Sequence, residues 1–282
     1  MFFFLTVMVV VSVFAAGYVI FFRTVFAQEI PPGFKNDIVF EEPDPPIPKE
    51  QFTESGDRGR LLHEELPRVA IIIDDLGYHE QVGDELINFP LELTYSFLPF
   101  APFTREQESA AFYSGKTVLL HLPLEPKDPH WDPGPGTLFL ADSPQLQKEK
   151  FDQDLAAVPH AVGVNNHMGS SYTEDKIVMR RLIQLITNNS LFFVDSFTTA
   201  ASVGQQIAQE AGIKTARRHI FLDNEMDQVK ICEQLRILVD LAEKQGQAIG
   251  IGHPHQVTAD ALHRCTEQYS SRVQYVSIAK LL

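Results

Sequence analysis

Carboxylate and imidazole side chains stand where the strand-like apolar runs of this sequence end. The run Val69–Ile73 is followed at once by two adjacent aspartates, Asp74 and Asp75, and then by Gly77. Later runs end in the same kinds of residue: His121, His167, Asp195, His253 and His255. Aspartate and histidine bind zinc and other divalent transition metals, and a bound ion lowers the pKa of water toward about 7. These residue types therefore indicate metal-assisted hydrolysis, in which one aspartate binds the ion and its neighbour accepts a proton from water.

Each of these residues also has a purely structural explanation. An aspartate after a strand often caps a helix or forms a turn, and Asp195, before Ser-Phe-Thr-Thr, fits a helix cap as well as a site. A histidine can be a hydrogen-bonded core residue or a loop residue, and the loop explanation applies more to His255 than to His253. Glu125 follows His121 by four residues, between two prolines, and is equally consistent with a solvated charge. The recurrence of the pattern on separate runs is the stronger indication.

Strands that alternate with helices must position these side chains. Short β-branched and apolar runs predict seven strands, at 68–74, 93–100, 116–124, 161–167, 191–196, 219–223 and 248–253. Helical periodicity is clearest at 174–189, 202–212, 227–246 and 258–269. Residues 126–145 are rich in Pro, Gly and Asp and predict a long loop. The alternation is typical of a parallel barrel or a doubly wound sheet, in which catalytic groups project from the carboxyl ends of the strands.

Length and charge limit the other possibilities. A chain of 282 residues holds one barrel-sized domain or two smaller ones, and no second linker interrupts residues 68–282, which we expect to fold as one unit. Residues 28–67 are rich in proline and acidic residues and predict an extended linker. The formal net charge of -14 argues against a nucleic-acid partner. Cys232 and Cys265 could form one disulfide or remain two buried thiols.

Residues 1–27 contain a hydrophobic segment that we expect to meet a membrane. Phe2–Phe22 carries no charged side chain, and a helix of this length can cross a hydrocarbon layer of about 30 Å. Its length and the lack of a preceding basic residue favour an uncleaved anchor, whereas Val25–Ala27 would serve as the cleavage site of an exported precursor. Arg23 follows the segment and by itself is only a weak orientation signal.

Five stretches that contain these aspartates and histidines together resemble a known protein family. In this order, the stretches AIIIDDLG, LLHLPLEP, GVNNHMGS, FFVDSFTT and IGIGHPH are similar to the divergent polysaccharide deacetylases, relatives of the NodB-type carbohydrate esterases. The resemblance covers residues 68–282. It implies a distorted (β/α) barrel of about seven parallel strands and a metal-dependent removal of acetyl groups from a polysaccharide such as peptidoglycan. Together with the N-terminal segment, it implies a periplasmic or otherwise extracytoplasmic location.

The resemblance also implies roles for individual residues. Asp74 matches the catalytic base of the paired carboxylates, and Asp75 matches the metal ligand. His121 resembles the first metal-binding histidine, and His253 resembles the histidine that acts as general acid. The metal implied for such a site is a divalent ion, with zinc expected first.

Two features differ from the family pattern. The esterases place their second metal histidine four residues after the first, where this chain has Glu125, so we expect His167 to supply the third ligand. The Arg-x-Pro-Tyr-Gly stretch of these enzymes has no counterpart here, and Asn-Asn-His-Met-Gly-Ser stands roughly in its place. Asp195 is expected to orient a neighbouring residue.

Three hypotheses follow for the function. The first is a metal-dependent deacetylase of an envelope carbohydrate. The second is a catalytically silent barrel that binds a glycan or an envelope protein and keeps the metal for structure or recognition. The third is a metal hydrolase that cleaves a different amide or a phosphate ester, since one barrel supports many reactions. The sequence does not indicate an oligomeric state.

Overall fold

The structure, a computed structural model, describes residues 66–282. The membrane segment expected in 1–27, and all but the last two residues of the linker expected in 28–67, lie outside the described residues. Within residues 66–282, no helix has the length and apolar character needed to cross a membrane.

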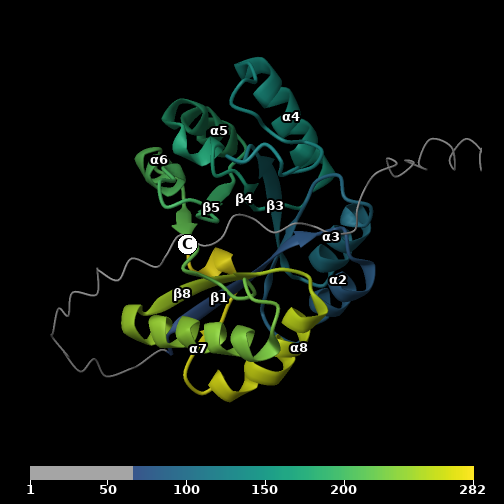
Figure 1. Cartoon of the computed structure of the whole chain (residues 1–282), viewed down its shortest axis with the longest axis vertical. Helices are drawn as coiled ribbons and strands as arrows, with labels where there is room; N and C mark the ends of the chain where they lie inside the picture. The colour runs from purple at the N-terminus through teal and green to yellow at the C-terminus, as the bar shows by residue number, and fades with distance from the viewer. Residues whose placement is uncertain (1–65) are drawn as a thin grey trace, which may run out of the picture. The chain divides into compact units, whose positions relative to one another are not determined.

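One parallel sheet runs through the described part of the chain and curls on itself (Figure 1). Its hydrogen-bonded order is β6-β5-β4-β3-β2-β1-β8-β7, and β9 pairs with the first two residues of β1. The strands are β1 Arg68–Leu76, β2 Thr94–Phe97, β3 Thr117–Leu124, β4 Gly163–Met168, β5 Phe192–Asp195, β6 Thr215–Arg217, β7 Ile220–Phe221, β8 Gln247–Gly252 and β9 Gln274–Tyr275. This curled parallel sheet is the distorted (β/α) barrel that the sequence predicts. It has nine strands, the seven predicted ones and the short strands β6 and β9.

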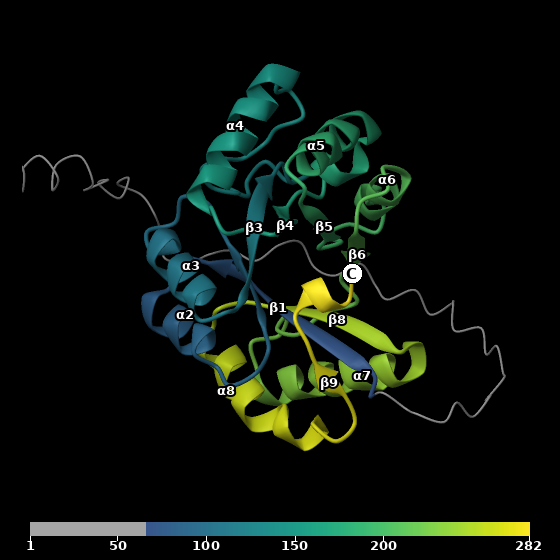
Figure 2. The same ribbon diagram turned by 180° about the vertical axis from the view of Figure 1, so that it is seen from behind.

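Helices cover the outer side of the sheet, as both views show (Figures 1 and 2). They are α2 Glu80–Ile87, α3 Thr104–Tyr113, α4 Pro144–Ala157, α5 Lys176–Asn188, α6 Gly204–Glu210, α7 Gln228–Gln245 and α8 Gln256–Cys265. The last four correspond to the predicted helices. Asp175 and Asp227 cap α5 and α7 by accepting hydrogen bonds from backbone N–H groups of the first turn.

The two faces of the sheet pack into two apolar clusters. Val69, Ile71 and Ile73 of β1 belong to the large cluster that the sheet shares with the helices. The alternate residues Ala70 and Ile72 belong to a smaller cluster inside the barrel. Strand side chains alternate between faces, so every second residue points inward. The next inward position on β1 is Asp74, and the same alternation makes His121, His167 and His253 inward residues of their strands.

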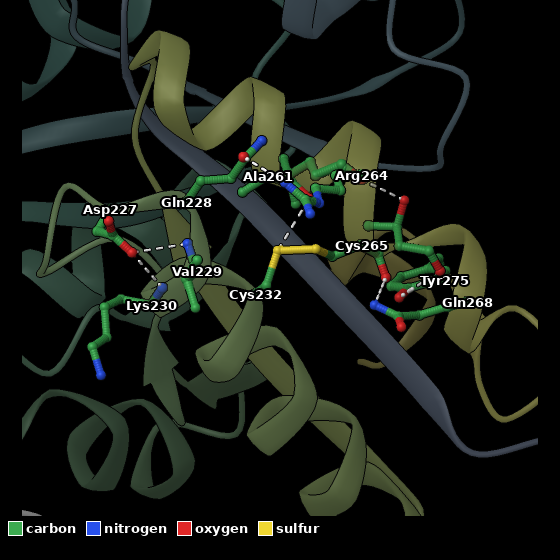
Figure 3. The surroundings of a disulfide bond; sticks show 12 residues. Asp227, Gln228, Val229, Lys230, Cys232, Ala261, Arg264, Cys265, Gln268 and Tyr275 are labelled. Atoms are coloured by element: carbon green, nitrogen blue, oxygen red, sulfur yellow. Dashed lines mark hydrogen bonds between the residues drawn. A yellow bond between two sulfur atoms is a disulfide. The ribbon is translucent and has the colours of Figure 1, made fainter.

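Cys232 of α7 and Cys265 of α8 form a disulfide (Figure 3). This settles the choice that the sequence leaves between a disulfide and two thiols. The bond ties two neighbouring helices on the outside of the barrel, and α8 begins directly after the stretch that carries His253 and His255. Disulfides of this kind persist in oxidising compartments.

We expect the double substitution of Cys232 and Cys265 by serine to lower the free energy of unfolding by about 3 to 4 kcal/mol. The 33-residue separation gives this magnitude through the loop entropy that the cross-link removes from the unfolded chain. Urea unfolding of the variant measures it, and wild-type protein treated with a reductant should give the same midpoint. An unchanged midpoint in both samples would contradict a stabilising role for the bond.

Candidate metal centre

Asp75, His121 and His167 bring three potential metal ligands to one point inside the mouth of the barrel. Asp75 Oδ1 lies 3.0 Å from His121 Nε2 and 2.8 Å from His167 Nδ1. The two ring nitrogens are 3.2 Å apart, and the ring centroids are separated by 5.0 Å. All three residues are buried, with exposed fractions of 2%, 2% and 4%. The three ligands expected from the sequence therefore lie together.

A local change in the backbone of β1 lets two consecutive aspartates face the same site. In a regular strand, Asp74 and Asp75 would point to opposite faces. The pairing with β2 shifts register between Ile73 and Leu76, and Asp75 has a left-handed φ of 54°. Asp75 Oδ1 is consequently in contact with His121, while Asp74 Oδ2 lies 3.8 Å from the same ring nitrogen.

The ligand atoms fit a divalent ion. Asp75 Oδ1 is buried close to both histidines, yet it makes no hydrogen bond of normal geometry. Such an orphaned oxygen is expected where ligands point at a shared ion rather than at each other. One carboxylate oxygen and two imidazole nitrogens are a common catalytic zinc set, which leaves a fourth position for water or substrate.

Electrostatics keep the ligand carboxylate ionised. Burial by itself would raise the pKa of Asp75, but interactions with His167 and His121 outweigh it and hold that pKa well below its usual range. At Asp74, burial prevails and raises the pKa, although His121, His253 and Asn165 oppose it. The two adjacent aspartates therefore have different proton affinities, as expected if one binds metal and the other exchanges protons.

His253 is held by a carboxylate that the sequence analysis did not single out. Its Nδ1 lies 2.9 Å from Asp223 Oδ1, and Asp223 Oδ2 accepts hydrogen bonds from the His253 backbone N–H and from Thr258 of α8. Burial alone would lower the pKa of His253, but Asp223 raises it to about 9. This imidazole therefore carries a proton at neutral pH. Asp223 ends the predicted strand 219–223, and that position was the available indication of its role.

Asp195 lies on the outer face of β5. Its neighbour Val194 points into the barrel, so Asp195 points toward the helices. There its carboxylate accepts hydrogen bonds from the backbone of Phe197, the Ser202 hydroxyl and the backbone of Gln205 at the start of α6. The structure thus does not bring the Asp195 side chain to the metal centre. Its expected role in orienting a neighbour stays a prediction, and any such effect would act through the segment that it fixes.

Glu125 organises the loop that follows β3. Its Oε2 accepts a hydrogen bond from the backbone of Leu140, and its backbone N–H donates to Leu138, so both ends of the loop are joined. Glu125 is not part of the Asp75 cluster. His255 lies at the N-terminus of α8, with its ring 6.5 Å from that of His253. It likewise lies outside the ligand set.

Substituting Glu125 by alanine is expected to leave the capacity for divalent metal unchanged while lowering the free energy of unfolding by about 1 to 2 kcal/mol. The variant loses a hydrogen bond between a partly buried carboxylate and a backbone N–H, but no metal ligand. Metal analysis and urea unfolding of the same preparation test both parts. A folded variant that no longer binds a metal which the wild-type protein binds would show that Glu125 belongs to the site.

Comparison with known proteins assigns the family. The model of the divergent polysaccharide deacetylases matches residues 71–282, which is most of this chain. The chain therefore belongs to the divergent polysaccharide deacetylase family. It is 32% identical over 221 residues to the uncharacterized protein YibQ of Escherichia coli, covering 76% of this chain and 67% of that protein.

Two further relatives agree with this assignment. An uncharacterized protein of Haemophilus influenzae is 33% identical over 214 residues, which is 76% of each chain. The crystal structure of an uncharacterized protein from Agrobacterium tumefaciens superposes with a TM-score of 0.74 at 25% identity, covering 78% of this chain and 91% of that one. Both relatives thus match this chain over about three quarters of its length.

Proposed function

We propose that this chain is a zinc-dependent deacetylase that removes acetyl groups from a polysaccharide of the cell envelope. One observation carries the proposal: a buried carboxylate, Asp74, adjoins the ligand set Asp75, His121 and His167 in a member of the polysaccharide deacetylase family. This arrangement supplies a base next to a position for a metal and its water. The identity of the metal as zinc is inferred from the chemistry of the ligands.

The residues divide the hydrolysis between them. Bound zinc would polarise the acetyl carbonyl and acidify the attacking water. Asp74 accepts a proton from that water as the water oxygen forms a bond to the carbonyl carbon. His253, protonated through its contact with Asp223, donates a proton to the departing nitrogen as the carbon–nitrogen bond breaks. Acetate and a free amino group are the products, and for an O-acetyl group the proton goes to the departing oxygen.

We further propose that the domain works on the extracytoplasmic side of the cell membrane. The uncharged N-terminal run 2–22 supports export or anchoring. The disulfide between Cys232 and Cys265 supports an oxidising compartment such as the periplasm. Both features agree with a substrate such as peptidoglycan, which lies outside the membrane.

Acetate release by the zinc-loaded full-length chain tests the function. N-acetylated glycan oligomers, peptidoglycan fragments and O-acetylated glycans would be assayed in parallel, with Asp74→Asn as the inactive variant. We expect acetate release from at least one class of substrate and a loss of about 10³-fold or more in Asp74→Asn. Binding of glycan without any release of acetate from a zinc-saturated protein would refute the proposal and support a catalytically silent binding module.

A further inference from the structure

Asn165 of β4 lies between the proposed base and a proposed metal ligand. Its Nδ2 donates hydrogen bonds to both oxygens of Asp74, at 2.8 and 2.9 Å. Its Oδ1 lies 3.0 Å from Nδ1 of His121 on the neighbouring strand. Asn165 is fully buried, with an exposed fraction of 0%. One amide thus contacts two functional groups through its two ends.

Neighbouring hydroxyl groups hold the amide in this orientation. Ser96 of β2 donates its hydroxyl hydrogen to Asn165 Oδ1, and Ser196, just after β5, lies 3.2 Å from Nδ2. With Asp74, His121 and Asn165 itself, these contacts connect five adjacent strands of the sheet, β1 to β5. A buried amide with partners at both ends cannot rotate without losing several hydrogen bonds.

The orientation also determines which nitrogen of His121 can bind metal. Both oxygens of Asp74 accept hydrogen bonds from Asn165 Nδ2, so the NH₂ group of the amide faces Asp74. The amide oxygen then faces His121, whose Nδ1 must carry the proton to make this contact. In the neutral imidazole, the lone pair is then on Nε2 of His121, which points toward Asp75 Oδ1 and His167 Nδ1. Fixing a ligand histidine through its other nitrogen is a common way to orient it for a metal.

We propose that Asn165 is a positioning residue that aligns the Asp74 carboxylate and sets the metal-binding tautomer of His121 at the same time. This inference rests on the proposed function, because it gives the two groups that Asn165 contacts the roles of base and ligand. In this role, the uncharged amide of Asn165 holds the Asp74 carboxylate in the orientation that a base requires. Asn165 does not touch substrate in this role; it acts through its two neighbours.

The two contacts can be separated by substitution. Asn165→Leu removes both, since leucine is similar in size but has no polar atoms. Asn165→Asp keeps an oxygen that accepts a hydrogen bond from His121 Nδ1, but it replaces the donor to Asp74 with a second carboxyl group. Asn166→Leu is the matched control, because Asn166 is the next residue and equally buried. Its amide bonds only to main-chain groups, Met168 O and Ser196 N.

Cobalt binding measures the effect on His121 without any assay of activity. The full-length protein is titrated with Co²⁺, which takes the same ligands as zinc, and its visible absorption reports their geometry. We expect Asn165→Leu to weaken cobalt affinity by about 10-fold to 100-fold and to change the absorption spectrum. Asn165→Asp and Asn166→Leu should bind cobalt within about threefold of wild type with the same spectrum.

Acetate release then measures the effect on Asp74. At saturating zinc, Asn165→Asp should lose about 10²-fold or more in kcat with little change in KM, because its metal site is intact and its base is not. Wild-type cobalt affinity and spectrum in folded Asn165→Leu would overturn the role at His121, and wild-type kcat in Asn165→Asp would overturn the role at Asp74. If wild-type protein binds cobalt but releases no acetate, the proposed function fails, while the cobalt results still decide whether Asn165 sets the His121 ligand.

Discussion

Replacement of His167 by alanine is expected to abolish stoichiometric zinc binding and to lower kcat/KM for acetate release by about 10³-fold or more. The other two ligands, Asp75 and His121, contact the same point, but two ligands from the protein rarely hold a catalytic zinc ion. Loss of a bound ion would remove both the polarisation of the acetyl carbonyl and the acidification of water, so the expected loss of rate is large. Metal analysis after dialysis and the initial rate of acetate release measure the two effects.

His130 provides the control for this experiment. It lies on the segment between β3 and β4, and its side chain is 89% exposed and contacts Asp128 rather than the metal centre. His130→Ala should keep one zinc per chain. If His167→Ala retained both zinc and activity, the third ligand would have to be another residue, and the assignment based on these contacts would be wrong.

Replacement of Asp223 by asparagine is expected to move the alkaline limb of the rate profile to lower pH. His253 must be protonated to act as the general acid, and Asp223 raises its pKa to about 9 from the ordinary 6.5. Without the carboxylate, burial favours the neutral imidazole. Even at the ordinary pKa, only about 3% of His253 would carry a proton at pH 8, so the rate there should fall at least about 30-fold.

The dependence on pH distinguishes this effect from simple damage to the structure. The ratio of variant to wild-type rates should rise as the pH falls toward 5.5, because a growing fraction of His253 in the variant becomes protonated. The ion pair between Asp223 and His253 also stabilises the fold. Because the folded pKa of His253 is raised, that stabilisation is complete below about pH 6.5 and is lost as the pH rises through about 9. An equal loss of rate at every pH would refute the role assigned to Asp223.

The meeting of His121 and His167, two of the three candidate metal ligands, could be predicted from sequence because of strand geometry. Inward positions recur every second residue, and parallel strands bring their carboxyl ends together, so His121 and His167 were expected to meet. The same alternation explains why the Asp195 side chain lies away from the candidate metal centre. Val194 is one of the apolar inward residues of β5, which leaves its neighbour on the helix side. Applying the alternation to each strand separately would have placed the Asp195 side chain on the helix side of the sheet.

Other parts of the site depend on contacts that a single sequence does not contain. Asn165 meets Asp74 across 91 residues and Ser96 across 69, and an asparagine in a strand has no pattern that indicates such partners. Asp223 could have been identified from the sequence, because it is a carboxylate at a predicted strand end. The direction of Asp75 also depends on a bulge, because regular alternation would have turned it away from His121.

Two of the three unpredicted helices, α3 and α4, were missed for a physical reason. The inward face of α4 carries Gln147 and Asp154 beside Phe151, and the inward face of α3 carries Gln107 and Glu108. Helical periodicity is recognised from apolar residues that repeat on one face, and here polar residues occupy those positions. β6 and β9 were missed for a simpler reason, since runs of 3 and 2 residues give too little alternation to detect.

The barrel is open between its end strands, β6 and β7, and these contain only 3 and 2 residues. An exposed strand edge is a template on which a second molecule can add its own strand, and a long edge promotes aggregation. Edges this short present few unpaired backbone groups. Many copies of the domain can therefore remain dispersed, although the sheet does not close into a complete ring.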